Sequence, residues 1–131
     1  MIKRRRTTPD FLKDREKLTK EEFGMKYFAH DKCLEKIAIE FLAHLEKTYN
    51  IDLSGIRPED RLCDILGQRK EEEETFDEYE TVSSIVKRAV KLYVDYRPFE
   101  KYLKNSTWDR TTIRHRSIGG MIREIGKHRK D

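Results

Sequence analysis

The chain has 131 residues, of which 41% are charged and 36% hydrophobic, and its formal net charge is +4 at pH 7. That length fits one domain with an ordinary core, and the periodic spacing of the apolar residues argues against a disordered chain. The sequence has no run of about 18 apolar residues, which a membrane-spanning helix needs, so we expect a cytoplasmic protein with no membrane partner.

The first expected helices are short. Residues 1–8 show no apolar period and are predicted to form a flexible basic tail before a single helical domain over 9–131. Pro9 suits the first position of a short helix. The sequence TKEE, which starts at Thr19, has the form of a capping box and predicts a helix over 20–28.

The strongest helical signal covers residues 32–49. Apolar side chains recur there at the i, i+3, i+4 and i+7 spacing that places them on one face of a helix. Asp31 is placed to cap the first turn, and Asn50 fits the end of the helix.

A loop with a Ser-Gly turn signal follows this helix. A short helix is then expected over 59–66, with Gly67 well placed to end it. Residues 68–80 form the most acidic stretch, which we expect to be an exposed loop because adjacent like charges repel one another. Its acidic residues are Glu71, Glu72, Glu73, Glu74, Asp77, Glu78 and Glu80.

Two more helices complete the prediction. Apolar residues over 81–96 have helical spacing, which outweighs a β-branched content that favours strand, and Pro98 is expected to end this helix. Residues 99–103 are expected to add one turn. A last helix is expected over 117–128, where two glycines in the first turn permit a close backbone approach or delay the start of the helix.

These elements predict an all-α fold, a single-domain bundle of four to five helices joined by irregular loops. The helices over 32–49 and 81–96 are expected at its centre, with 59–66 and 117–128 packed across them. The expected core consists of Leu34, Ile37, Phe41, Leu42, Leu45, Leu62, Ile65, Leu66, Val82, Ile85, Val86, Ala89, Val90, Tyr93, Ile118, Met121, Ile122 and Ile125.

No familiar chemistry is signalled by the motifs. Sequences typical of a phosphate-binding loop, a serine hydrolase or a zinc protease do not occur. His30 and Cys33 have ligand spacing but lack the second pair of ligands that zinc needs, and Cys33 and Cys63 fit buried thiols in a reducing compartment. We expect no catalytic residue, cofactor or metal ion. The sequence favours a protein that is not an enzyme, without excluding an unfamiliar active site.

The charges are divided unevenly along the chain. Residues 1–20 carry 8 Lys and Arg against 3 Asp and Glu, residues 21–100 carry 12 against 19, and residues 101–131 carry 9 against 3. Basic ends attract nucleic acid or acidic partners, whereas an acidic middle attracts basic partners.

The preferred hypothesis is a small protein-interaction module that binds a protein partner through its charged surface. The acidic residues of 68–80 are the expected contacts, and an immunity or inhibitor protein that occludes a basic partner is one form of this role. The alternative is a nucleic-acid-binding protein, in which basic side chains contact phosphates and an aromatic ring stacks on a base. Its expected contacts are Arg4, Arg5, Arg6, Trp108, Arg110, Arg114, Arg116, Arg123 and Lys127.

The order of the elements over residues 32–125 also resembles that of acyl carrier proteins. The matching segments are 32–49, 56–67 (IRPEDRLCDILG), 81–96, 99–103 (FEKYL) and 111–125 (TTIRHRSIGGMIREI). The resemblance implies a helical bundle with a D-S-L motif, whose serine carries the prosthetic arm. Here the first serines after Gly67 are Ser83 and Ser84, and neither follows an aspartate. No attachment serine is therefore transferred, and the resemblance implies at most a carrier-like bundle that binds a partner without a prosthetic group.

Overall fold

The computed structural model describes residues 10–66, 83–84, 87–88, 90–91, 93–105 and 116–129, with the backbone alone at 66 and 103–105. The all-α prediction is confirmed: this part of the chain contains six helices, slightly more than the four to five expected, and two isolated β-bridges without a sheet. The helices are α1 (Asp10–Lys13), α2 (Lys20–Phe28), α3 (Lys32–Tyr49), α4 (Leu62–Leu66), α6 (Tyr96–Asn105) and α7 (Ile118–Gly126).

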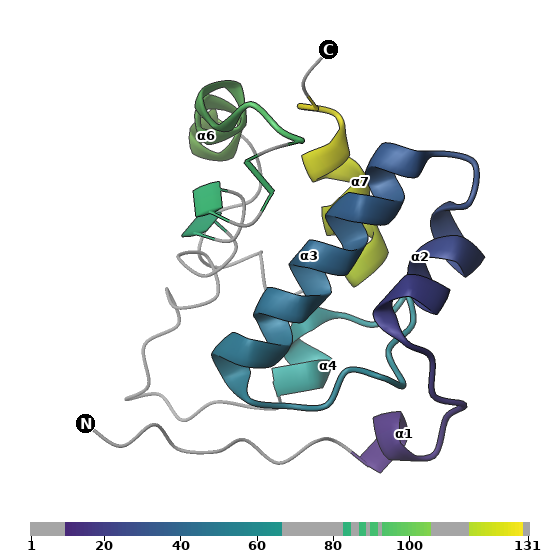
Figure 1. Cartoon of the computed structure of the whole chain (residues 1–131). Coiled ribbons are helices and arrows are strands. Elements are labelled where there is room, and N and C mark those ends of the chain that lie inside the picture. Colours follow the sequence, from purple (N-terminus) through teal and green to yellow (C-terminus); the bar gives the residue numbers. More distant parts are fainter. Residues whose placement is uncertain are drawn as a thin grey trace, which may run out of the picture.

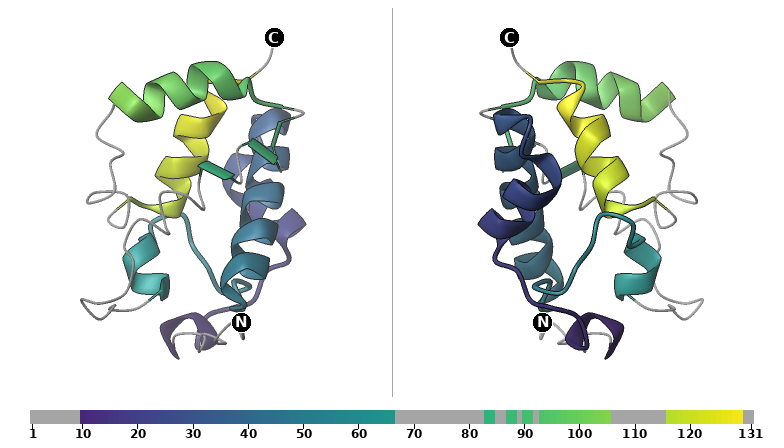
Figure 2. Two further views of the ribbon diagram at one scale, coloured as in Figure 1. Left: turned by 90° about the vertical axis from the view of Figure 1, so that its left-hand side faces the viewer. Right: turned by 90° about the vertical axis from the view of Figure 1, so that its right-hand side faces the viewer.

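Helix α3 is the centre of the molecule, and both α2 and α7 pack against it. Helix α6 lies across one end of the α3–α7 pair, whereas α1 and α4 lie at the other end (Figures 1 and 2). No helix in the described part of the chain is long and apolar enough to cross a membrane.

The local signals for α2 and α3 predicted their bounds correctly. The Thr19 hydroxyl accepts a hydrogen bond from the Glu22 amide at 3.0 Å, and the Glu22 carboxylate accepts one from the Thr19 amide at 2.8 Å. Asp31 Oδ1 accepts a hydrogen bond from the Leu34 amide at 3.1 Å, and Asn50 ends α3 in the left-handed conformation with φ of 54°. These caps satisfy backbone groups that the helix ends leave unpaired.

The helix expected over 59–66 begins later, at Leu62, because the preceding residues pair with the start of α7. The Ile118 amide donates to the Asp60 carbonyl at 2.8 Å, and the Gly119 amide donates to the Pro58 carbonyl at 2.8 Å. A Cβ at Gly119 would lie 2.7 Å from Pro58 Cβ, so glycine permits this close approach. Ser117 caps α7 through a 3.0 Å hydrogen bond from the Gly120 amide.

The helix expected over 81–96 is wrong at its end. Ser83, Ser84, Lys87 and Arg88 are helical, but the described backbone from Val90 to Asp95 is not, and a new helix, α6, begins at Tyr96. The backbone before α6 pairs with the residues after α7 and does not continue the helix: Val94 is bridged to Arg129, and the Asp95 amide donates to the His128 carbonyl at 3.0 Å.

Pro98 was expected to end a helix but lies in the first turn of α6, where the missing N–H removes no helical hydrogen bond. The single turn expected over 99–103 is therefore a longer helix. Helix α6 packs on α7 and on the residues that follow it. The Tyr102 hydroxyl donates to Glu124 Oε2 at 2.8 Å, and the ring centroids of Tyr102 and His128 are 4.9 Å apart.

The predicted core is largely confirmed where its side chains are described. Tyr93 is only partly buried against the core, and Leu66, Val82, Ile85, Val86 and Ala89 lie outside the described side chains. The two cysteines are free and half-buried. Further buried side chains, which the sequence prediction did not include in its core, are Leu12, Phe23, Phe28, Ala38, Tyr49, Ile51, Leu53, Ile56, Val94 and Phe99.

Candidate functional site

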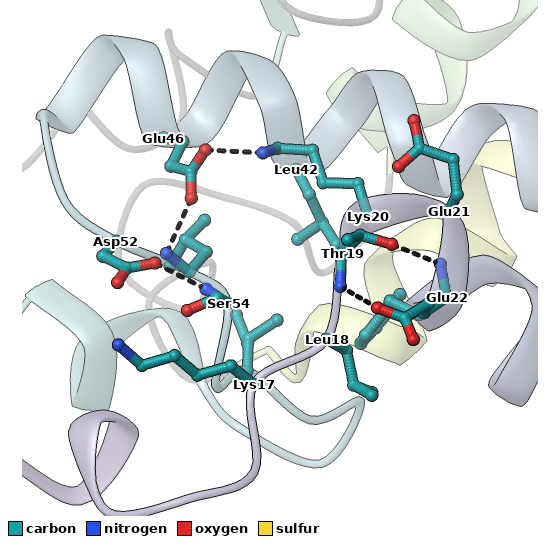
Figure 3. Close-up of a pocket in the computed structure, with 13 residues that line it drawn as sticks. Lys17, Leu18, Thr19, Lys20, Glu21, Glu22, Leu42, Glu46, Asp52 and Ser54 are labelled. Atoms are coloured by element: carbon teal, nitrogen blue, oxygen red, sulfur yellow. Dashed lines mark hydrogen bonds and ion pairs between the residues drawn. The ribbon is translucent and has the colours of Figure 1, made fainter.

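A hollow of about 450 Å³ opens beside the start of α2 (Figure 3). Three parts of the chain line it: residues 17–23 from the α1–α2 linker and the first turn of α2, Leu42 and Glu46 of α3, and residues 52–54 with Ile56 from the loop after α3. Helix α2 packs on α3, and the α1–α2 linker is hydrogen-bonded to the loop after α3. The hollow lies between these three parts of the chain.

The linker that forms one wall is fastened to the loop by polar contacts. The Leu18 amide donates to the Ser54 carbonyl at 2.8 Å. The Arg57 side chain donates to the Glu16 carbonyl at 2.9 Å. Arg15 reaches Asp60 at 2.6 Å, and this carboxylate is buried, with 6% of its surface exposed. The wall is therefore preformed, so a ligand does not have to order it.

Ion pairs and hydrogen bonds connect the three walls. Lys20 Nζ of α2 lies 2.6 Å from Glu46 Oε1 of α3, and Glu46 Oε2 accepts a 2.8 Å hydrogen bond from the Leu53 amide (Figure 3). Asp52 Oδ1 accepts a hydrogen bond from the Ser54 amide at 2.9 Å. Hydrogen bonds from Ser54 lower the pKa of Asp52, and Lys17 and Lys20 add to that effect. Asp52 is therefore ionised at neutral pH.

A second, shallower hollow of about 360 Å³ adjoins the first, because Leu18 and Glu22 line both. Met25 contributes to it and is 64% exposed, the one large hydrophobic side chain that is exposed among those described. We call the residues lining both hollows the Leu18 surface. Apolar groups on this surface are Leu18 and Met25, with the buried side chains of Phe23, Leu42, Leu53 and Ile56 behind them.

The Leu18 surface is acidic although the whole chain is basic. It carries five carboxylates and three lysines, against a formal charge of +4 for the chain. One lysine, Lys20, is already paired with Glu46. The charged residues of this surface are Glu16, Glu21, Glu22, Glu46, Asp52, Lys17, Lys20 and Lys26.

The arrangement suits binding through apolar and charged contacts. Several polar groups of this surface stabilise the fold: Thr19 and Glu22 cap α2, and Glu46 of α3 contacts both Lys20 of α2 and the loop after α3. Within the residues that the structure describes, no group of three or more His, Cys, Asp or Glu side chains is arranged to hold a metal ion.

The predicted protein-binding residues Glu71, Glu72, Glu73, Glu74, Asp77, Glu78 and Glu80 lie outside the described residues, together with the rest of 68–80 and the tail 1–8. The same holds for six of the predicted nucleic-acid contacts, namely Arg4, Arg5, Arg6, Trp108, Arg110 and Arg114. These parts of both hypotheses stay predictions.

Three predicted nucleic-acid contacts are described, and all lie at or on α7. The guanidinium of Arg123 lies 5.3 Å from the Phe28 ring centroid, and Lys127 Nζ lies 2.8 Å from Glu124 Oε1. Arg116 is half-buried, and its carbonyl accepts a hydrogen bond from the Leu62 amide at 3.2 Å. The side chains of Arg123 and Lys127 therefore make contacts within the chain.

The sequence prediction missed the Leu18 surface as a site. The capping box at Thr19 located the start of α2, but no local pattern relates Lys20 to Glu46 or Leu18 to Ser54, which only the packing of α2 on α3 brings together. No protein-family model, curated protein or solved structure matches this chain. The resemblance to acyl carrier proteins stays a prediction.

Proposed function

We propose that this chain is a non-enzymatic protein-interaction module and that its partner docks on the Leu18 surface. One observation carries the proposal: Met25 is 64% exposed on a surface whose two hollows share Leu18. Apolar groups at the centre of a surface with charged residues around them match the composition of a protein interface.

The dimensions and rigidity of the hollow support this role. A volume of about 450 Å³ is large enough to receive a side chain of the partner as an anchor. The wall formed by the linker is held by the Arg15–Asp60 ion pair and the Leu18–Ser54 hydrogen bond. A preformed wall lowers the entropy that binding has to overcome.

The acidic residues of 68–80 belong to the proposal as a second, electrostatic contact. Seven carboxylates in that segment attract a basic partner and accelerate the encounter. An immunity or inhibitor protein that covers a basic partner is one form of such a module.

The test is an affinity purification from the native host with the full chain, compared between the wild type, Leu18→Asp and Met25→Asp. Each variant places a carboxylate where we expect an apolar contact. Lys91→Gln is the matched control, because it makes the same change in net charge at an exposed residue outside the Leu18 surface.

A stoichiometric protein that the wild type and Lys91→Gln retain, and that both Asp variants lose, is the expected result. Retention of that protein by Met25→Asp and Leu18→Asp would contradict docking on this surface. Co-purification of nucleic acid alone, removed by nuclease, would replace the proposal by the nucleic-acid alternative. Circular dichroism of each variant verifies that it is folded.

A further inference from the structure

We infer, resting on the proposed function, that the partner segment on the Leu18 surface is apolar and basic: an aliphatic side chain lies against Leu18 and Met25, and a neighbouring lysine or arginine enters the 450 Å³ hollow beside Asp52 and Glu46.

The charge balance of the surface favours a cation. Five carboxylates face three lysines, and Lys20 is neutralised by Glu46 at 2.6 Å. The excess is therefore negative at a place where the chain as a whole is positive. This negative charge repels a phosphate or an acidic peptide and attracts a basic side chain.

The carboxylate of Glu46, which lines the hollow, retains hydrogen-bonding capacity. Glu46 Oε1 lies 2.6 Å from Lys20 Nζ, and Glu46 Oε2 accepts a hydrogen bond from the Leu53 amide at 2.8 Å. A carboxylate has about four acceptor positions in all. Glu46 can therefore accept a hydrogen bond from an ammonium or guanidinium group in the hollow and keep its contacts with Lys20 and Leu53.

The apolar groups explain why the occupant is a peptide segment and not an isolated cation. Leu18 lines both hollows, and Met25 of α2 lines the second one. A ligand that covers Met25 and also fills the larger hollow must carry two different side chains. Two neighbouring residues of a partner chain satisfy this requirement.

The experiment uses two labelled peptides that share the same leucines and differ only in having lysines or glutamates between them. Binding to the full chain is measured by fluorescence anisotropy at two salt concentrations. Amide chemical shifts in an NMR titration locate each peptide, with the amides of Leu18, Leu53 and Ser54 as reporters of the hollow.

We expect the lysine peptide to bind, to shift these amides and to lose affinity at higher salt. Glu21→Gln and Asp52→Asn should each weaken its binding by about two- to five-fold, and Lys17→Ala should strengthen it by a similar factor, as befits partly exposed charge pairs. Asp64→Asn on α4 removes a carboxylate outside the Leu18 surface and serves as the control that leaves affinity unchanged.

Equal or tighter binding of the glutamate peptide at the same amides would overturn the inference about the basic segment and leave the docking surface in place. Shifts confined to residues outside the Leu18 surface would overturn it as well. The proposed function is decided separately, by whether Leu18→Asp and Met25→Asp lose the host partner, so the two failures are distinguishable.

Discussion

Arg129 Nη1 lies 2.6 Å from Asp31 Oδ2, so the residues after α7 are joined to the N-cap of α3 across 98 positions of sequence. The other oxygen of Asp31 caps α3 by accepting from the Leu34 amide. Hydrogen bonds from Arg129 and from the Leu34 amide lower the pKa of Asp31 below its ordinary value of 3.8. One carboxylate therefore stabilises a helix end and a long-range contact together.

The two roles of Asp31 can be separated by substitution. Asp31→Asn keeps a capping side chain and loses the ion pair, which is partly exposed, so we expect a loss below about 1 kcal/mol. Asp31→Ala also removes the cap and should cost about 1–2 kcal/mol. Because the folded-state pKa is lowered, the ion pair stabilises the protein above the unfolded pKa and is lost as pH falls through the folded one. In urea unfolding, the free energy of unfolding should differ less between wild type and Asp31→Asn at pH 2 than at pH 7. An equal difference in the free energy of unfolding at both pH values would contradict this.

Asp60 is expected to be the most sensitive acidic residue in the described part of the chain. It is 6% exposed and accepts from Arg15 Nη1 at 2.6 Å and from the Arg57 amide at 2.8 Å. Asp60→Asn weakens both contacts in a buried place and should lower the free energy of unfolding by about 1–3 kcal/mol. Hydrogen exchange of the Leu18 amide should also accelerate, because the linker loses an anchor.

Asp10→Asn is the matched control for this substitution. Asp10 pairs with Lys13 at 3.7 Å with 94% of its side chain exposed, and such pairs contribute little. If urea unfolding gives equal losses for Asp60→Asn and Asp10→Asn, the buried ion pair does not anchor the linker.

Two glycines in helices should respond to alanine with opposite signs. A Cβ at Gly24 would make ordinary contacts with Glu35, the nearest at 3.4 Å, so Gly24→Ala should stabilise the protein by about 0.5–1 kcal/mol through the better helix propensity. A Cβ at Gly119 would lie 2.7 Å from Pro58 Cβ and 3.1 Å from the Pro58 carbonyl. Gly119→Ala should therefore separate α7 from the loop and destabilise the protein. Thermal unfolding of both variants is the measurement, and a rise in Tm for Gly119→Ala would show that the contact is not tight.

Phe41 is fully buried in the middle of α3. Phe41→Ala should lower the free energy of unfolding by about 3–5 kcal/mol, because it leaves a cavity that α2 and α7 cannot fill without moving. Met25→Ala, at an exposed position of α2, is the control and should change stability by less than about 0.5 kcal/mol. A loss of less than about 1 kcal/mol in the free energy of unfolding for Phe41→Ala would contradict the placement of Phe41 in the core.

The sequence by itself determined the elements whose signals are local. The caps at Thr19 and Asp31 and the apolar face of 32–49 each depend on residues within a few positions of one another. The bounds of α2 and α3 therefore follow from helix geometry alone. Most of the predicted core that the structure describes follows from the same periodicity.

Only the tertiary structure decided the remaining features. Helix α4 starts late because the backbone of Pro58 and Asp60 pairs with the start of α7, and the helix expected to reach residue 96 stops earlier because Val94 is bridged to Arg129. The Leu18 surface depends likewise on segments 20 to 40 positions apart, as Lys20 and Glu46 or Leu18 and Ser54 show. Such contacts have no periodic signature in the sequence, because they depend on which elements pack together. That packing depends on all the core side chains and not on any one segment.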